Sequence, residues 1–289
     1  MIQALGALLI GSLVGVLTGM FGVGGGFLIT PLLNIVLGVP MPIAVGTSAI
    51  QILGVSTNAL YERRHEERPA LKMAIVLFGG NFVGVLLGAS LLSYLAGLGS
   101  LSFGENTVAI VDLALLLTFL PLLLGIAWWL YRDTRKNPES PVIRIGWFSK
   151  LKIPPYTQFS ALESPQLSII VMVYFGLCLG LLTGLLGIGG GVILLPSLVY
   201  LVGLRTRRAI STSLLMVWLT SIVAVITHTL AGNVDLLLAI PLLFGGILGA
   251  RVGSRLCASL TGTWLRRSFV YVVLLAVIIV LSKIVVLLV

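Results

Sequence analysis

Long apolar stretches separated by short polar segments dominate the pattern of this chain. The stretches run at about 3–42, 43–61, 71–98, 108–131, 168–203, 209–230, 236–257 and 268–289. Most of them reach the length of about 20 residues that a helix needs to cross a bilayer. The pattern therefore predicts an all-α polytopic membrane protein in which these stretches lie in the lipid.

A glycine-dense decapeptide occurs twice, as LTGMFGVGGG at 17–26 and as LTGLLGIGGG at 182–191, 165 positions apart. At this offset, 15 of the 40 positions from 11 to 50 are identical without a gap. Internal repetition of this kind indicates two copies of one structural unit. We predict a first transmembrane repeat at 1–131, a polar linker at 132–167 and a second transmembrane repeat at 168–289.

The first stretch of each copy, 3–38 or 168–203, is too long for one crossing. A straight helix of its 36 residues would rise about 54 Å, against a hydrocarbon core of about 30 Å. If both stretches are helical hairpins with an apex at the glycines, 17 of the 18 basic residues face the cytoplasm and only Lys283 lies outside. Eight single crossings would instead place seven of the 18 outside, against the positive-inside rule.

The predicted fold is therefore two inverted-topology repeats, each made of a broken, re-entrant helical hairpin plus three transmembrane helices. Five elements per copy invert the second copy relative to the first, which is a transporter architecture. We expect a multi-pass protein of the cell (inner) membrane with both termini outside and the linker 132–167 in the cytoplasm.

Composition narrows the function classes. The chain is 58% hydrophobic and only 9% charged, whereas about a quarter of the residues of a soluble globule are charged. The net charge of +9 comes from loops between apolar stretches, so membrane orientation explains it and no nucleic-acid partner is expected. No HExxH, Cys/His cluster, Ser/His/Asp set or carboxylate pair occurs in the apolar stretches. We expect no enzyme, no metal site and no cofactor.

The glycine clusters supply the candidate chemistry. Unwound backbone is tolerated at membrane depth only where it is buried in protein or lines a wet cavity, and the half-helix that restarts after each cluster directs its positive dipole end there. Bare amide groups and this dipole favour an anion, and hydroxyl groups that recur in both copies can bind its oxygens. The candidate substrate-binding residues are Gly22, Gly24, Gly25, Gly26, Gly187, Gly189, Gly190, Gly191, Thr18, Thr183, Thr47, Ser48, Thr212 and Ser213.

Structural alternatives stand beside these assignments. Glycines spaced by four serve close helix packing, and this is the interpretation for Gly80, Gly84, Gly88, Gly245, Gly249 and Gly253. Intramembrane Ser and Thr side chains often bond their own helix backbone. His228 is either a solvated residue near a helix end or part of a proton relay.

The motifs resemble those of a known family. LTGMFGVGGGFLITP and LTGLLGIGGGVILLP are followed by AVGTS at 44–48 and RAISTS at 208–213, and this pair is similar to the sulfite exporter TauE/SafE family of bacterial and archaeal membrane proteins. The likeness covers roughly 3–98 and 168–257. It implies transport of sulfur-containing anions such as sulfite, sulfoacetate or other organosulfonates, mostly as export.

The sequence thus predicts a secondary transporter that works by alternating access around an anion site at the membrane midplane. Two alternatives stay open, a passive anion channel and a transporter of a different small organic anion. The expected partners are the small anionic substrate, the lipid bilayer and a coupling proton or other ion, while the oligomeric state is left open.

Overall fold

A computed structural model describes residues 2–64, 68–103, 106–136, 147–151, 153–159, 167–260 and 262–288 of the protein. Its first half contains five helices and a short hairpin of strands. These elements are α1 (Ile2–Phe21), α2 (Gly26–Leu37), α3 (Met41–Glu62), α4 (Leu71–Ala96), β1 (Ser100–Phe103), β2 (Asn106–Ala109) and α5 (Ile110–Lys136). The antiparallel β1–β2 ladder pairs Ser100 with Ala109 and Phe103 with Asn106, in a segment where the sequence pattern predicts no regular element.

The second half repeats the order of the helices. Its elements are η1 (Trp147–Lys150), β3 (Tyr156–Thr157), β4 (Leu167–Ser168), α6 (Ile169–Leu186), α7 (Gly191–Ser197), η2 (Leu198–Val202), α8 (Thr206–Leu230), α9 (Leu236–Ser259) and α10 (Gly262–Leu288). The first turn beyond Pro196 is a π-helix, η2. Because proline removes a backbone donor, Pro196 interrupts the regular hydrogen bonding of the helix at this position.

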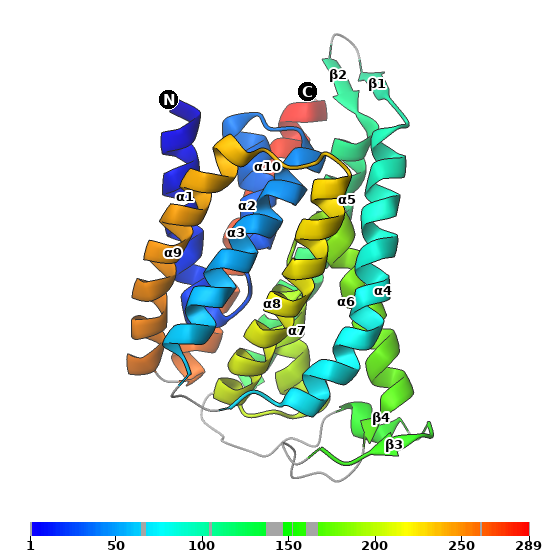
Figure 1. The fold of residues 1–289 in the computed structure, drawn as a ribbon, viewed down its shortest axis with the longest axis vertical. Helices are drawn as coiled ribbons and strands as arrows, with labels where there is room; N and C mark the ends of the chain where they lie inside the picture. Colours follow the sequence, from blue (N-terminus) through cyan, green and yellow to red (C-terminus); the bar gives the residue numbers. More distant parts are fainter. Residues whose placement is uncertain are drawn as a thin grey trace.

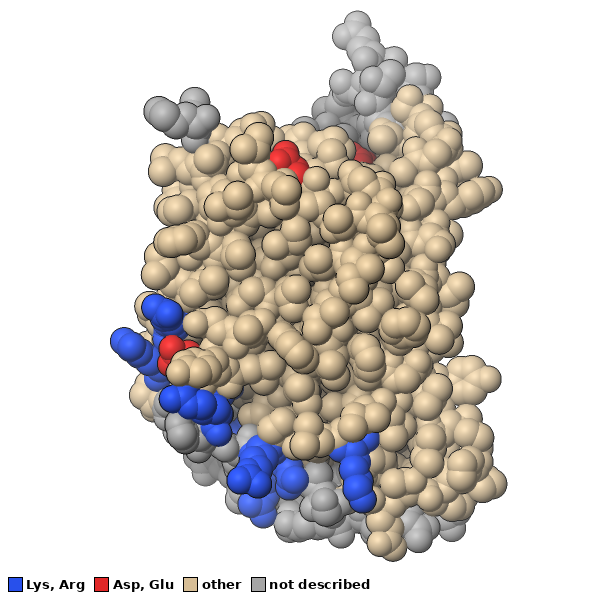
Figure 2. Space-filling view, viewed as in Figure 1, with Lys and Arg blue, Asp and Glu red and all other residues tan. Residues whose placement is uncertain are grey.

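The helices run roughly along one axis, and the two ends of the bundle differ. Figure 1 shows both chain termini at one end, together with β1 and β2, whereas β3 and β4 lie at the other end. Lys and Arg side chains gather at the β3–β4 end on the face drawn in Figure 2, and the opposite end of that face shows none. We call these the terminal end and the basic end.

Close helix pairs hold the two halves of the chain together. α1 packs along α9, and α4 packs along α6. A Cβ added at Gly245 or Gly249 would meet the α1 backbone, and one at Gly80 or Gly84 would meet the α6 backbone. The packing role predicted for the glycines spaced by four is confirmed, since only residues without a side chain permit such close approach.

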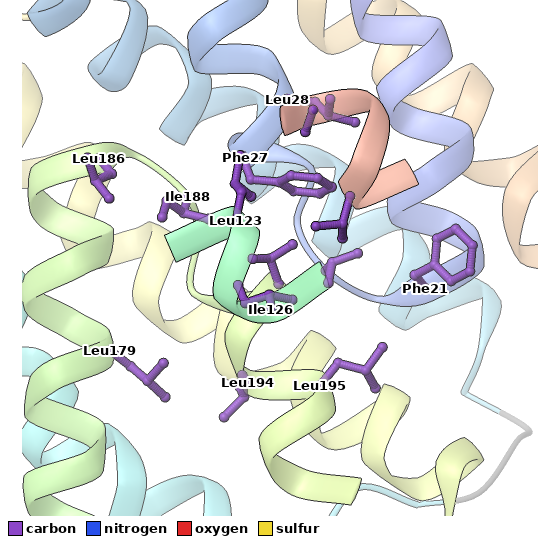
Figure 3. Packing of buried hydrophobic residues seen from close by; sticks show 14 of the residues in the cluster. Phe21, Phe27, Leu28, Leu123, Ile126, Leu179, Leu186, Ile188, Leu194 and Leu195 are labelled. Atoms are coloured by element: carbon purple, nitrogen blue, oxygen red, sulfur yellow. The ribbon is translucent and has the colours of Figure 1, made fainter. Parts of the chain in front are cut away.

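The polytopic membrane character is also confirmed. Within the described residues, eight helices are long and apolar enough to span a bilayer. Two shorter apolar helices, Gly26–Leu37 and Gly191–Val202, lie among them. The buried core surrounds the short helices, and Figure 3 shows some of its side chains near the helix breaks, among them Phe21, Phe27 and Ile188.

Candidate functional site

Both halves of the chain break at the glycine decapeptide. α1 ends at Phe21 and α2 begins at Gly26, while α6 ends at Leu186 and α7 begins at Gly191. The backbone angles of the two breaks repeat closely. The φ values are 67°, 77° and 71° at Gly22, Gly24 and Gly25, and 66°, 70° and 71° at Gly187, Gly189 and Gly190. Residues other than glycine rarely adopt this left-handed conformation. Each break therefore requires glycines at the same positions, which explains why the glycine motif occurs in both halves.

The two breaks cross each other inside the protein. A Cβ added at Gly26 would meet the Gly187 carbonyl, and one at Gly191 would meet the Val23 carbonyl. The side chains of Ile52 and Val217, which are 165 positions apart, lie against the crossing from α3 and α8. Residues 22–26 and 187–191 are all buried. The breaks therefore form one buried element to which both halves of the chain contribute.

Two matched serines tie each break to the other half of the chain. The Ser213 hydroxyl of α8 donates to the Gly22 carbonyl at 3.1 Å. The Ser48 hydroxyl of α3 lies 3.4 Å from the Gly187 carbonyl and 2.8 Å from the carbonyl of Val45 in its own helix. Both serines are fully buried. The structure thus brings these two predicted residues to the breaks.

Of the four predicted threonines, two lie at the breaks. Thr18 and Thr183 lie beside Gly25 and Gly190. Each of these hydroxyls donates to the carbonyl four residues earlier in its own helix, at 3.0 Å and 2.9 Å. This is the helix-bonded state that intramembrane hydroxyls often adopt.

The other two threonines, Thr47 and Thr212, hold loops instead. Thr47 accepts a hydrogen bond from the Asp235 amide at 3.1 Å, and Thr212 accepts one from the Ala70 amide at 3.0 Å. Thr47 contacts the α8–α9 loop at the terminal end, and Thr212 contacts the α3–α4 loop at the basic end. The structure does not bring their side chains to the breaks.

Backbone amides are the free donors of the crossing. Within the described part of the chain, the amide groups of residues 23–27 and 188–192 donate no hydrogen bond to another protein group. The next amides in each helix, those of Leu28 and Ile193, donate to Gly25 and Gly190 at 3.0 Å and 3.2 Å. Buried amides without partners are costly. The crossing therefore offers two consecutive runs of donors to a ligand with acceptor oxygens.

A buried arginine lies next to one break. Arg63, at the end of α3, is 5% exposed, and its Nη2 donates to the carbonyls of Gly19 and Met20 in the last turn of α1. A cation at this position stabilises the negative end of the helix dipole. From the sequence, Arg63 is one of the basic residues expected at the cytoplasmic face, with no further role. Arg63 and His228 stand at matched positions, 165 residues apart. This pairing of two basic residues of different type is the sequence signal that points to Arg63.

Metal-binding side chains do not gather in the residues that the structure describes. No group of three or more His, Cys, Asp or Glu residues in that part of the chain could hold a metal ion. The crossing itself contains only glycines and the apolar residues Val23 and Ile188. Its chemistry is thus that of amide donors.

Eight apolar spans and two interrupted helices that meet inside the bundle define a polytopic membrane transporter. The chain belongs to the sulfite exporter TauE/SafE family, whose sequence profile matches residues 7–280. This membership confirms the resemblance seen in the motifs, and it confirms a membrane transporter in place of an enzyme.

Relatives across bacteria and archaea carry names of the same kind. The chain is 29% identical over 255 residues to the probable membrane transporter protein YjnA of Bacillus subtilis, covering 86% of this chain and 88% of the relative. It is 27% identical over 249 residues to a probable membrane transporter protein of Xylella fastidiosa, covering 85% and 82%. It is 24% identical over 267 residues to the probable membrane transporter protein MJ0441 of Methanocaldococcus jannaschii, covering 86% of each. No solved structure gives a significant match.

Proposed function

We propose that the protein is a secondary transporter that exports small sulfur-containing anions, namely sulfite, sulfoacetate or other organosulfonates. The anion binds at the crossing of residues 22–26 and 187–191, near the middle of the membrane, and the protein exposes this site to each side in turn. The substrate class comes from the family, which is described as sulfite exporters.

The observation that carries the proposal is the pair of buried amide runs at residues 23–27 and 188–192, which have no hydrogen-bond partner among the described residues. A sulfonate or sulfite group carries three oxygens that accept hydrogen bonds, so one such group can satisfy donors from both runs. Successive amides next to left-handed glycines are a known form of anion-binding concavity. The helices that begin at Gly26 and Gly191 add their positive ends.

The hydroxyl groups have a secondary part in this proposal. Those of Thr18, Thr183, Ser48 and Ser213 use their protons on carbonyl groups. Each must rotate away from its carbonyl before it can donate to an anion. Thr47 and Thr212 hold the loops that frame the two ends. Amides therefore provide most of the binding, and without a cation in the crossing the affinity is modest, which allows release.

Alternating access follows from two inverted repeats, which we propose as residues 1–131 and 168–289. The matched contacts support this. The pairing of α1 with α9 corresponds, at the offset of 165, to the pairing of α6 with α4. The first helix of each half also begins at a different end, α1 at the terminal end and α6 after β4 at the basic end. Rocking of one repeat against the other would expose the crossing to each side.

In the proposed orientation, both termini lie outside the cell membrane and residues 132–167 lie in the cytoplasm. The gathering of Lys and Arg side chains at the basic end (Figure 2) supports this assignment. Lys283 of α10, the one basic residue expected outside, is close enough to Asp112 in the first turn of α5 to interact with its charge.

The test combines a flux assay with one matched pair of glycine variants. In proteoliposomes, the wild type should move sulfite and sulfonates in preference to sulfate and carboxylates, with saturation and counter-transport. Flux that rises linearly without counter-transport would indicate the alternative, a passive channel. Preference for carboxylates would indicate the other alternative, a different small organic anion.

Gly190→Ala and its control Gly38→Ala test the crossing itself. Both glycines have positive φ, at 71° and 67°, but Gly38 has nothing within 4 Å of an added Cβ and lies away from the crossing. At Gly190 the new Cβ meets only the Thr183 hydroxyl, at 3.1 Å. Gly190→Ala should weaken anion binding at least about tenfold, or 1.4 kcal/mol, because the following amides are rotated. If both variants bind sulfoacetate as the wild type does, the crossing is not the site.

A further inference from the structure

Arg63 and His228 occupy matched positions, 165 residues apart, at the ends of α3 and α8. Arg63 donates to the carbonyls of Gly19 and Met20, near the end of α1. Gly184 is the residue of α6 that corresponds to Gly19. Its carbonyl is the backbone acceptor that faces the His228 side chain. Each half of the chain thus directs one basic side chain at the carbonyl end of its first half-helix.

His228 is enclosed by protein. Its exposed fraction is 0%, so the expectation of a solvated histidine is wrong. Its Cβ lies against Gly46 of α3, and its carbonyl accepts the Asn233 amide at 2.9 Å, which fixes the end of α8. The loop that follows brings its own carbonyl, that of Asn233, against Gly46.

The ring nitrogens of His228 have spare capacity for hydrogen bonds. Neither Nδ1 nor Nε2 makes a hydrogen bond with good geometry in the structure, although the ring faces the Gly184 carbonyl. The neutral ring therefore leaves an acceptor and a donor without partners. A hydrogen bond from the ring to Gly184 would correspond to the one that Arg63 makes with Gly19 in the other half.

Fixed charges lie elsewhere on the elements around His228. α6 carries no charged residue, and the charges of α3, α4 and α9 lie at Glu62, Lys72, Arg251 and Arg255, toward the basic end. Asp235, in the loop after α8, uses its carboxylate to cap α9 by accepting from the amides of Leu237 and Leu238. Tyr94 on α4 is 67% exposed. Asp112 of α5, at the same end of the molecule, accepts from the Met41 amide of α3, so a substitution of His228 is needed to distinguish its titration from that of this carboxylate.

We propose that His228 is the proton-binding residue that couples proton movement to anion transport at the crossing. The proposal rests on the proposed function, because the bound anion supplies the negative charge that a buried imidazolium needs. A proton from water binds one ring nitrogen, and the cation then donates to the Gly184 carbonyl in the arrangement that Arg63 shows with Gly19.

The short path between His228 and the crossing explains the coupling. Gly184 precedes Gly187 by three residues, or about 5 Å along the helix axis, and Ser48, two residues beyond Gly46, contacts the Gly187 carbonyl. A buried imidazolium without a counter-charge is costly, and so is a buried anion without one. When both bind, each offsets the cost of the other, and the linkage is reciprocal.

The experiment measures proton uptake on anion binding. Calorimetric titration of the purified full-length protein with sulfoacetate at pH 7, in buffers of different ionisation enthalpy, gives the protons taken up per anion. Sulfoacetate is the probe because both of its acidic groups are fully ionised at this pH, whereas sulfite itself titrates there. The wild type should take up a substantial fraction of one proton per anion, and binding should tighten as the pH falls from 8 to 6.

Three variants separate charge from structure. His228→Gln keeps the polarity without titration and should abolish proton uptake and the pH dependence of binding. His228→Arg supplies the permanent cation found at Arg63 and should bind the anion without proton uptake at any pH in this range. His65→Gln removes the other histidine of the chain and should behave as the wild type does.

The outcomes distinguish this proposal from the proposed function. Undiminished proton uptake by His228→Gln would overturn the assignment of His228, and so would anion binding by the wild type without proton uptake, while the anion site would stand. Absence of any anion binding by the wild type would overturn both. If His228→Gln does not fold, proton uptake by a folded His228→Arg variant would still contradict the proposal.

Discussion

The terminal end and the basic end of the molecule are built from matched segments but are closed differently. At the terminal end, polar groups of α2, α3 and α5 join around Asp112. At the basic end, the matched segments are α7 with η2, α8 and α10, and they surround an apolar pocket. The same backbone plan therefore gives one end held by hydrogen bonds and one end with a small apolar pocket.

The polar cluster of the terminal end consists of Asn34, Met41 and Asp112. The Asp112 carboxylate accepts from the Met41 amide at 3.3 Å and from Asn34 Nδ2 at 3.5 Å. Asn34 is 5% exposed and also donates to the Val39 carbonyl at 2.9 Å. The cluster satisfies the first amide of α3 and fixes the loop between α2 and α3, so it holds these helices together above the crossing.

The residues at the corresponding positions of the basic end cannot form such a cluster. Val199 and Thr206 stand where Asn34 and Met41 stand in the other half, and the first turn of α10, unlike that of α5, carries no acidic residue. Val199 and Thr206 line a small apolar pocket that is partly open to the surroundings. The pocket reaches Phe21 and Ile210, and Ile210 packs on Gly22.

This difference gives the two ends of the molecule unequal free-energy barriers to opening. An end closed by charge-assisted hydrogen bonds opens at a larger free-energy cost than one closed by apolar contacts around empty space. For the proposed alternating-access cycle, we therefore expect the basic end to open more readily from this state than the terminal end. Three kinds of substitution test this difference between the ends: those that weaken the polar cluster, those that remove the matched loop contacts, and one that fills the pocket.

The largest effect is expected from Asp112→Ala. The change removes the acceptor of the Met41 amide and one partner of Asn34, and hydrogen bonds to a charged group contribute about 1.5–3 kcal/mol. The unfolding free energy should fall by about 2–3 kcal/mol, measured in detergent by thermal or denaturant unfolding. A thiol introduced as Val45→Cys, beneath the cluster, should also react faster with a reagent added from outside.

Asp112→Asn is the matched control for this variant. The amide oxygen still accepts from Met41, so about half of the loss should be recovered, while the negative charge near Lys283 disappears. Equal stability of the wild type and Asp112→Ala would show that the cluster does not hold the terminal end closed.

A smaller effect is expected from removing the two matched threonine contacts. Thr47→Val leaves the Asp235 amide without its partner, and Thr212→Val does the same to the Ala70 amide. Each change should lower the unfolding free energy by about 1 kcal/mol. Similar losses would show that the ends differ only in the cluster and the pocket. A loss confined to Thr47→Val would mean that the loops also contribute to the difference.

The sequence predicts the membrane class, the two breaks and the glycine packing because each depends on local pattern. Glycine spacing forces the breaks at 22–25 and 187–190, and the spacing of four gives the close helix pairs. A repeated motif also specifies that two such breaks exist. These features need no knowledge of which helix lies beside which.

Contacts between distant segments could not be predicted in the same way. Thr47 and Ser48 are adjacent in sequence, so their side chains point about 100° apart on a helix, and only Ser48 faces a break. Asn34 and Asp112 meet across 78 residues. The burial of His228 depends on the packing of α3 and α6 around the end of α8. In each case the rotation and neighbours of a helix decide the contact, and the pattern of one sequence does not encode them.

The smallest expected effect comes from filling the pocket at the basic end with Val199→Leu. Val199 is 9% exposed and lines the pocket, so one added methylene should enter empty space and stabilise the protein by about 0.8 kcal/mol. Transport should slow, because the same space must widen when the basic end opens, while sulfoacetate affinity should not change. The control Val36→Leu adds the same group at a position that is 60% exposed. It should change neither the unfolding free energy nor the transport rate. If Val199→Leu is more stable but transports at the wild-type rate, the pocket is a packing defect. The basic end would then not be the end that opens.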